Sequence, residues 1–455
     1  MHFTRRLLDP RRSGLFVSLP LLAAAVAVGC SSSDEPTQAP LPDAGADASE
    51  TVDASDASDA GRDAAVFDGR PRPVECASSP CATALVTTLG RSVDDDDEGF
   101  CVLLDDGTVA CWGGNQAGQL GRGEAEGAPL VDSSVAARVA GLSNVASLDH
   151  SCAVDKSGGA WCWGTGPFSW SGDAGAVSTT HTTAVKLDLP PVTKVARTFD
   201  TACAVLTTGD VQCWGSNARA QLGPMTETFS GAPVRVALPS GASASALEVG
   251  NAAFVIREDG SLLSWGANPG IGRVSPSTPD ALPQLVSLDR VTQVDSAYDS
   301  VCALANGDAY CWGARTNPVK GKPNERALPE PAPSPEPLVQ IATTRPQGYA
   351  LNDGKLRDFK PYRWCAVGDS GALYCWGFNE SGQAGTGDEE YVTRAARVVG
   401  LPEDSLVAQV KTTTNTTCAL LTTGKVYCWG SNYNGQLGNG LNRGKSLTPT
   451  EVVLP

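Results

Sequence analysis

From about residue 76 to the C-terminus, short apolar runs alternate with polar, glycine-rich turns. The stretch 151–164 shows the repeated unit: an apolar run, a polar turn that ends in glycine, and a second apolar run. This pattern predicts β-hairpins. Seven copies occur at steps of 47 to 64 residues, and each ends in Trp-Gly at one of the following tryptophans: Trp112, Trp163, Trp214, Trp265, Trp312, Trp376 and Trp429. A period in this range indicates a solenoid or a propeller.

Two further apolar runs precede each regular hairpin, for example 396–399 and 406–410 before the seventh. Two strands and a hairpin make four strands, which is the content of one propeller blade. We therefore predict an all-β, seven-bladed β-propeller with four-stranded blades. Only one strand, near 84–88, has clear room before the first hairpin, and an extra strand at 448–454 follows the last. We expect these N- and C-terminal strands to share one blade and so close the ring.

The hairpin turns carry the residues that specific turn types require. Six turns have three residues with glycine last, at 105–107, 156–158, 207–209, 258–260, 369–371 and 422–424. Glycine suits the left-handed position of a three-residue hairpin loop. The fifth hairpin is one residue shorter and has Asn306-Gly307, the preferred type I′ turn.

When the hairpin residues are paired outward from each turn, cysteines lie opposite each other in six copies. The fourth copy has Phe254 and Ser264 instead, so both partners are missing together. We expect disulfides between these pairs, and between the two cysteines left over: Cys101–Cys111, Cys152–Cys162, Cys203–Cys213, Cys302–Cys311, Cys365–Cys375, Cys418–Cys428 and Cys76–Cys81. The alternatives are zinc ligation or free thiols, but the chain has no Cys-x-x-Cys cluster and only 3 histidines. We predict an oxidising compartment and no metal site.

The N-terminus has the features of an export signal. Basic residues precede an apolar run from Leu15 to Val28, which is short for a membrane span. The run ends in Ala27-Val28-Gly29-Cys30, which resembles the lipobox of bacterial lipoproteins. The resemblance implies a signal peptide at 1–29, an acylated Cys30 and attachment to the envelope, with Ser31 compatible with the outer membrane or cell surface. Ordinary signal cleavage with an unmodified cysteine is the alternative.

Residues 30–75 are rich in Ser, Ala, Asp and Pro and have too little apolar surface to fold. We predict a disordered acidic tether that holds the folded body, 76–455, away from the membrane. Calcium binding by Asp53, Asp56 and Asp59 is the alternative, although the familiar chelating loops also use ordered carbonyls and a terminal glutamate.

A glycine-rich loop, best seen at 113–123, follows the regular hairpins. Neither a helix N-terminus nor a P-loop lysine follows it, so we interpret it as a structural turn and not as a phosphate site. The whole pattern, Cys-Ala-Leu…Gly-x-Val-x-Cys-Trp-Gly-x-Asn-x-x-Gly-Gln-Leu-Gly, resembles the regulator-of-chromosome-condensation repeat over about 82–455. The resemblance implies a seven-bladed propeller, and the hairpin cysteines resemble secreted bacterial members. The nucleotide-exchange residues of the eukaryotic namesake find no match. A secreted bacterial relative inhibits β-lactamases through rim loops, so the fold can act as an extracellular binder.

Charge and candidate chemistry favour binding over catalysis. The net charge of −16 argues against nucleic acid as a partner. His150 precedes a blade cysteine and is expected to be structural, and His181 is expected in a loop. No catalytic constellation or cofactor motif stands out. We predict a monomeric, non-catalytic protein-binding module of the cell envelope. The alternatives are an envelope polysaccharide-binding protein or a polymer-degrading enzyme with carboxylates in the propeller channel.

Candidate binding loops lie where the repeat departs from itself, because aromatic and arginine side chains are typical interface anchors. One departure holds Phe168 and Trp170, and a proline-rich one covers 317–337. A third, before the sixth hairpin, is basic and aromatic and supplies the remaining candidates: Arg357, Phe359, Lys360, Tyr362 and Arg363. The second and third flank the same predicted blade, so we expect one patch. The alternative is that these are surface insertions without a ligand.

Overall fold

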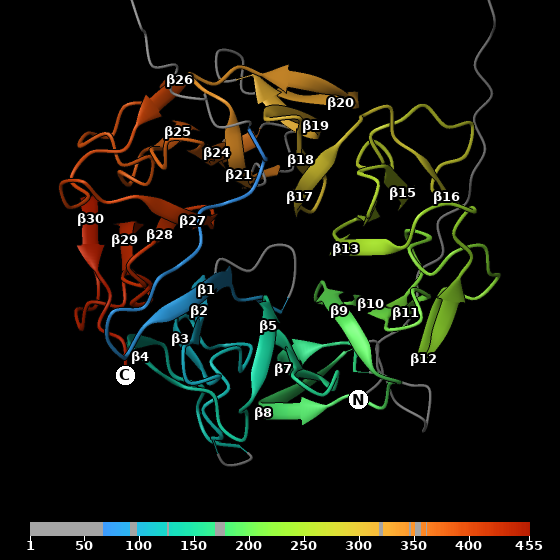
Figure 1. The fold of residues 1–455 in the computed structure, drawn as a ribbon, viewed down its shortest axis with the longest axis horizontal. Helices are drawn as coiled ribbons and strands as arrows, with labels where there is room; N and C mark the ends of the chain where they lie inside the picture. Colours follow the sequence, from blue (N-terminus) through green and yellow to red (C-terminus); the bar gives the residue numbers. More distant parts are fainter. Residues whose placement is uncertain are drawn as a thin grey trace, which may run out of the picture. The chain divides into compact units, whose positions relative to one another are not determined.

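The computed structural model describes residues 67–455 except 92–97, 125–126, 169–177, 318–321, 345–346, 351–355 and 361. Signal, lipidation and tether predictions before residue 67 lie outside the described residues. Within the compact unit that begins at Ala65, seven four-stranded antiparallel sheets form a ring (Figure 1). The predicted seven-bladed β-propeller is confirmed.

The strands follow the chain from blade to blade. The first three blades contain β1 (Ala82–Thr87), β2 (Gly99–Leu104), β3 (Val109–Gly113), β4 (Ser133–Arg138); β5 (Val145–Asp149), β6 (Cys152–Asp155), β7 (Ala160–Gly166), β8 (Thr179–Lys186); β9 (Val192–Arg197), β10 (Thr201–Leu206), β11 (Val211–Ser216) and β12 (Phe229–Val236). Blades 4 and 5 contain β13 (Ala244–Val249), β14 (Ala252–Arg257), β15 (Leu262–Gly266), β16 (Asp280–Leu285); β17 (Val291–Ala297), β18 (Ser300–Ala305), β19 (Asp308–Asn317) and β20 (Lys322–Ala332).

Blades 6 and 7 contain β21 (Leu338–Thr343), β24 (Arg363–Gly368), β25 (Leu373–Gly377), β26 (Val392–Arg397); β27 (Val407–Thr412), β28 (Thr416–Leu421), β29 (Val426–Ser431) and β30 (Lys445–Glu451). A separate two-stranded sheet, β22 (Gln347–Ala350) and β23 (Leu356–Lys360), is inserted between β21 and β24. The first strand of each blade lies nearest the axis of the ring (Figure 1).

The prediction that both termini share one blade is wrong. Each blade uses one strand before its hairpin and one strand after it, so the phase of the repeat differs by one strand from the sequence prediction. The run at 396–399, predicted for the seventh blade, overlaps the end of β26 in the sixth. The C-terminal strand pairs with its own hairpin, with Cys428 opposite Thr450. An antiparallel strand that directly follows a hairpin pairs with it most readily, which leaves no strand to exchange.

The ring closes through the same contacts that join the other blades. At six junctions, the first inner-strand residue donates its N–H to the hairpin glycine carbonyl of the preceding blade, for example Val145 to Gly107 at 3.0 Å. At the junction of blades 7 and 1, Ala82 donates to Gly424 at 3.0 Å. The Trp112 indole there donates to the Gln436 carbonyl at 2.9 Å. Closure is therefore made by packing and hydrogen bonds between complete blades.

The hydrophobic core lies between neighbouring blades. All seven Trp-Gly tryptophans are buried, as predicted. The cluster at the closing junction mixes residues of blade 1, such as Phe100 and Trp112, with Leu420 and Val426 of blade 7. Each blade therefore buries its apolar face only when both neighbours are present.

The hairpins have the predicted register. All seven predicted disulfides are present, and the six hairpin pairs have Cα atoms 4.0–4.1 Å apart. In blade 4, Phe254 lies opposite Ser264, whose hydroxyl donates to the Ile271 carbonyl at 2.6 Å. Asn306 and Gly307 both have positive φ, 55° and 85°, as a type I′ turn requires.

Candidate functional site

The alternation of strand directions sorts the loops onto two faces. We call the side that carries the hairpin turns the hairpin face, and the side that carries the connections between first and second strands and between third and fourth strands the loop face. Two of the three predicted binding segments fall in loop-face connections, one between β7 and β8 and the other between β21 and β24. The proline-rich segment 317–337 reaches both faces. It leaves β19 on the loop face, forms β20 and ends on the hairpin face, where the Asp369 N–H donates to the Pro337 carbonyl at 2.8 Å.

Residues 67–75 lie on the hairpin face, and we call them the strap. Arg72 donates to the Asp369 carbonyl at 2.9 Å, and the Glu75 N–H donates to the Thr422 carbonyl at 2.8 Å. Phe67 packs against the core between blades 6 and 7. Figure 1 shows this segment in blue, crossing the blades before β1. Residues 67–75, predicted as the end of the tether, belong to the folded body.

Arg363 is a buried residue of the propeller and is not accessible to a partner, which corrects its place among the binding candidates. It begins β24, is fully buried, and donates to the carbonyls of Thr413 at 2.6 Å and Thr414 at 3.1 Å. Burial lowers its pKa to about 9, and the charge of Glu98 opposes that shift. The guanidinium therefore fastens blade 6 to blade 7.

The other candidates of the third segment divide into two groups. Tyr362 is half-buried, and its ring lies 4.7 Å from that of Trp364. Arg357, Phe359 and Lys360 are placed by backbone on β23. Their side chains lie outside the described residues.

Phe168 is also buried, contrary to the prediction of an exposed aromatic. Its ring packs edge-on to His181 at 4.3 Å, and the Arg197 guanidinium lies 5.9 Å from it. His181 lies on β8 and not in a loop, and burial lowers its pKa. Trp170 lies outside the described residues. Phe168 is the aromatic residue of this segment that the structure describes, and it packs inside the propeller.

His150 has the structural position that the sequence predicted. Its Nδ1 atom lies 3.0 Å from the Thr87 hydroxyl oxygen of the preceding blade. This contact joins blades 1 and 2 at the loop-face end of the channel.

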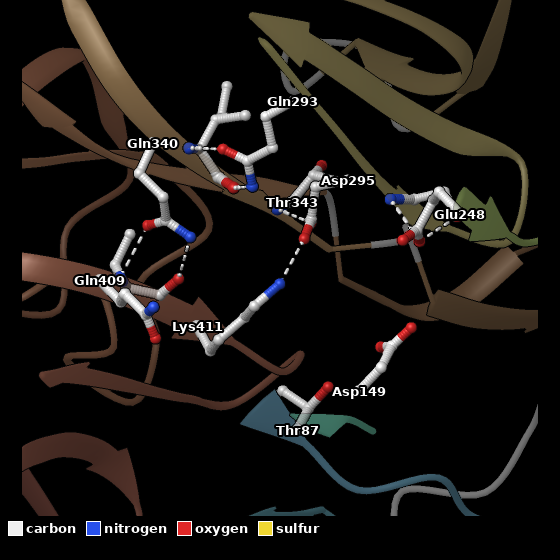
Figure 2. A network of polar contacts seen from close by, with 12 residues as sticks. Thr87, Asp149, Glu248, Gln293, Asp295, Gln340, Thr343, Gln409 and Lys411 are labelled. Carbon is white, nitrogen blue, oxygen red and sulfur yellow. Dashed lines mark hydrogen bonds and ion pairs between the residues drawn. The ribbon is translucent and has the colours of Figure 1, made fainter. Parts of the chain in front are cut away.

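Side chains of the inner strands line the central channel and join neighbouring blades. Gln293 donates to the Ile341 carbonyl at 2.8 Å and accepts the Ile341 N–H at 2.9 Å. Gln340 makes the same pair of bonds with Val410. Figure 2 shows these glutamines around the channel.

Two residues further along the inner strands lies a charged cluster, formed by Asp149, Glu248, Asp295 and Lys411 (Figure 2). Lys411 Nζ lies 2.8 Å from Asp295 Oδ1. Burial raises the pKa of Glu248 well above its usual range, and Asp149 and Asp295 raise it further. Burial disfavours the charge on Lys411, but Asp295, Glu248 and Asp149 together outweigh burial and raise the pKa of the amine.

The cluster also makes contacts between blades. Glu248 accepts the Ser296 N–H at 3.2 Å, and Asp295 accepts the Thr343 N–H at 2.8 Å. Among the described residues, no group of three or more His, Cys, Asp or Glu side chains could hold a metal ion. These carboxylates therefore have a structural role as inter-blade acceptors.

The channel opens differently at its two ends. The loop-face end holds a cavity of about 160 Å³ beside Thr343 and Thr412, which is smaller than most ligand sites. The hairpin-face end holds about 840 Å³ and is lined partly by strap residues 68–71. The strap therefore covers part of the wide mouth.

An open groove of about 640 Å³ lies on the loop face where blade 7 meets blade 1. Its walls include Tyr433, which is 75% exposed, and Val131, which is 67% exposed. Arg443 also lines it. Sequence reasoning missed this groove because Tyr433 lies in a regular copy of the glycine-rich turn, and the available signal was an aromatic residue at an otherwise small or polar position.

Protein-family models match segments of this repeat. Models of the regulator of chromosome condensation (RCC1) repeat match residues 192–221 and 407–436, and a further one matches 423–455. These segments of the chain are therefore similar to RCC1 repeats. The segments 192–221 and 407–436 each run from an inner strand through a hairpin into the glycine-rich turn, so the matched unit begins at the inner strand of a blade and ends on the loop face.

Two curated proteins are similar over most of the propeller. The ultraviolet-B receptor UVR8 of Arabidopsis thaliana is 28% identical over 382 residues, which cover 80% of each chain. The human E3 ubiquitin-protein ligase HERC2 is 26% identical over 349 residues, which cover 73% of this chain and 7% of that protein.

Two solved structures share the fold. Prp20p of Saccharomyces cerevisiae, studied for its binding to Gsp1p and histones, has a TM-score of 0.60 at 18% identity and covers 77% of this chain and 87% of its own. Human WBSCR16 has a TM-score of 0.59 at 18% identity, with coverage of 76% and 95%. At this identity the likeness shows the fold alone.

Proposed function

We propose that this protein is a lipid-anchored, extracytoplasmic propeller that binds a protein partner through its loop face and catalyses no reaction. The observation that carries the proposal is the division of the two faces. The strap holds the incoming chain on the hairpin face, whereas the divergent segments between β7 and β8 and between β21 and β24 connect strands on the loop face. A tether that arrives on one face leaves the opposite face free for a partner.

The anchor would hold the protein at the membrane. Cys30 is the proposed lipid attachment, and the chain enters the folded body through the strap on the hairpin face. A flexible tether of this length spans about 30–36 Å on average, so the folded body would stay near the membrane surface. The seven disulfides agree with an oxidising compartment outside the cytoplasm.

In the described part of the chain, no helix has the length and apolar character needed to span a membrane.

The partner would be a protein of the envelope or its surroundings, and we propose that the chain acts as a monomer without a cofactor. Its net charge of −16 supports a protein over nucleic acid. A protein of the same fold, Prp20p, was studied for its binding to Gsp1p and histones, so this fold can present a surface to protein partners.

The first experiment is capture from envelope extracts with the full chain, solubilised in detergent. The test variant replaces Arg357, Phe359, Lys360 and Tyr362 with alanine and keeps Arg363, which holds blade 6 to blade 7. The matched control replaces Thr207 and Thr208 on the hairpin face. A partner retained by wild type and control but lost by the test variant supports the proposal. Equal retention by all three would move the site elsewhere, and capture lost only with the control would contradict loop-face binding.

The anchor has its own test. Metabolic labelling with palmitate should mark the wild type and not Cys30→Ser, and only the wild type should fractionate with membranes. A labelled Cys30→Ser variant would contradict lipidation at this residue.

Binding or cleavage of an envelope polysaccharide is the second candidate, and the carboxylates of the channel are the observation that favours it. Against it, Glu248 and Asp295 are both engaged with the next blade. Degradation of purified envelope polymers that disappears in Glu248→Gln would replace the binding proposal with an enzymatic one.

A further inference from the structure

The groove between blades 7 and 1 has the features of a binding site that the fold does not require. Its walls come from the two loop-face turns that follow β3 and β29, so it exists only because the ring is closed. Tyr433 and Arg443 come from blade 7, and Val131 and Asp132 come from blade 1. All four lie on the face that the strap leaves uncovered.

Tyr433 stands at a turn position where the other blades provide an internal comparison. The residue after the turn asparagine is Gln116 in blade 1, Ala218 in blade 3 and Glu380 in blade 6, and all three are exposed. The turn forms with each of these side chains, so packing does not demand an aromatic residue. A tyrosine exposed to 75% leaves apolar ring surface in water, where a partner could cover it.

Arg443 has an unusual backbone conformation beside this ring. Its φ is +69°, a region that glycine or asparagine adopts at lower cost. The N–H of Arg443 donates to the Asn432 carbonyl at 2.8 Å, and the Asn432 N–H donates to the Gly444 carbonyl at 2.9 Å. Among the described residues, no carboxylate pairs with its guanidinium. The turn thus holds a positive charge at the groove with no acidic partner of its own.

Asp132, the acidic residue that lines the groove, is hydrogen-bonded to both turns. Asp132 accepts the Asn115 N–H at 3.0 Å and the Asn434 side-chain N–H at 2.7 Å. These bonds link the two turns and hold the groove in one shape, which lowers the entropy cost of binding. Two arginines, Arg91 and Arg443, line the groove against the single carboxylate of Asp132, so the net charge of its lining is positive.

We propose that this groove binds an extended, acidic segment of a protein partner. A carboxylate of that segment pairs with Arg443, and a neighbouring apolar side chain inserts between Tyr433 and Val131. Charge complementarity and the aromatic wall select this occupant. The inference rests on the proposed function, since it names the chemistry of the partner and one site on the loop face.

The test uses a displayed library of random peptides, panned against the full chain in detergent. The first variant, Tyr433→Gln, copies the residue of blade 1. The second, Arg443→Asn, removes the charge but suits the left-handed backbone. Glu380→Gln, at the matching position of blade 6, is the control. Unfolding midpoints of all four proteins are measured first.

We expect the enriched peptides to combine acidic and apolar residues. Each groove variant should weaken their binding by about tenfold or more, while the control changes it less than twofold. Higher salt should weaken binding to the wild type more than to Arg443→Asn. The proposal is overturned if no such peptide is enriched, or if the peptides bind both groove variants as well as the wild type.

The envelope capture experiment separates this inference from the proposed function. A partner that is retained when Tyr433 and Arg443 are both replaced would overturn the groove and leave the binding function standing. Loss of that partner in the double variant, with retention by Glu380→Gln, would support both.

Discussion

Arg363 and Arg197 are charged side chains that the propeller uses in its interior. Both are buried, and both donate to backbone carbonyls of a neighbouring blade. Sequence reasoning placed Arg363 on a surface patch because basic and aromatic residues precede it. Composition alone does not separate the two roles, since the difference lies in which carbonyls are within reach after folding.

Replacement of Arg363 tests this role. Arg363→Ala should lower the free energy of unfolding by about 3 kcal/mol, because several carbonyls of blade 7 lose their donor and a cavity remains. Denaturant unfolding measures the effect. The control is Arg235→Ala, which breaks an exposed ion pair and should cost less than about 1 kcal/mol. Unchanged stability with lost partner binding would return Arg363 to the binding surface.

Glu248 predicts a pH dependence. Its raised pKa means that the folded state binds more protons than the unfolded state above the ordinary glutamate value of 4.5. The free energy of unfolding contributed by this group therefore falls as pH rises above that value. Asp149, Asp295 and Lys411 face the same carboxyl and remain in the variant.

Glu248→Gln keeps the acceptor for the Ser296 N–H but removes the titration. The variant should gain stability relative to the wild type as pH rises from 5 to 8, measured by denaturant unfolding at each pH. His181 has a lowered pKa, so its contribution to the free energy of unfolding rises with pH in both proteins. Subtracting the wild-type value from the variant value at each pH removes this contribution. A difference independent of pH would show that Glu248 is not protonated in the folded state.

At the scale of elements, the hairpin is the unit that local sequence determines. The turn residues, the cysteines and the register agree in the six disulfide-bonded hairpins. Where blade 5 loses one residue, Asn306-Gly307 changes the turn type and Cys302 still lies opposite Cys311. Where blade 4 lacks cysteines, the register is unchanged. Turn chemistry is therefore sufficient to set the pairing, and the disulfide adds stability.

Removal of one hairpin disulfide should reveal how much stability that disulfide contributes. Cys203→Ala with Cys213→Ala should lower the free energy of unfolding by about 3 kcal/mol, because the unfolded chain regains the entropy of a closed loop. The comparison is made with and without reductant. The double variant should differ from the wild type less under reducing conditions. An equal difference in both would mean that this pair is reduced in the native protein.

At the scale of the whole molecule, the ring closes without exchange of a strand. The closing junction has the glycine carbonyl bond and the tryptophan bond of the other junctions, and Gln409 accepts the Leu85 N–H at 2.8 Å. Glu98 adds a further contact, accepting the Asn415 N–H at 2.8 Å. These side-chain contacts hold the ends of the chain together across a sequence distance of more than 300 residues.

Gln409→Ala tests the closing junction. The Leu85 amide loses its acceptor, so its protection against hydrogen exchange should fall by about tenfold. The Val410 amide, which donates to Gln340 across the next junction, should keep its protection. Equal loss at both amides would indicate that the propeller opens as a whole and that the closing junction is no weaker than the others.

Local sequence is enough to predict the number of blades, the hairpin turns and the disulfide pairs, because each repeat, turn and cysteine pair involves residues close together in the chain. The strand before each hairpin and the strand after it have similar apolar patterns. Periodicity therefore does not show to which blade each of these strands belongs. Only antiparallel pairing in the folded sheet decided that phase.

Tertiary structure also decided the candidate site. The burial of Phe168 and Arg363, the path of the strap over the hairpin face and the groove beside Tyr433 all depend on contacts between distant segments. The groove in particular joins two turns at opposite ends of the chain. A local pattern specifies such turns one at a time, whereas closure of the ring brings them together.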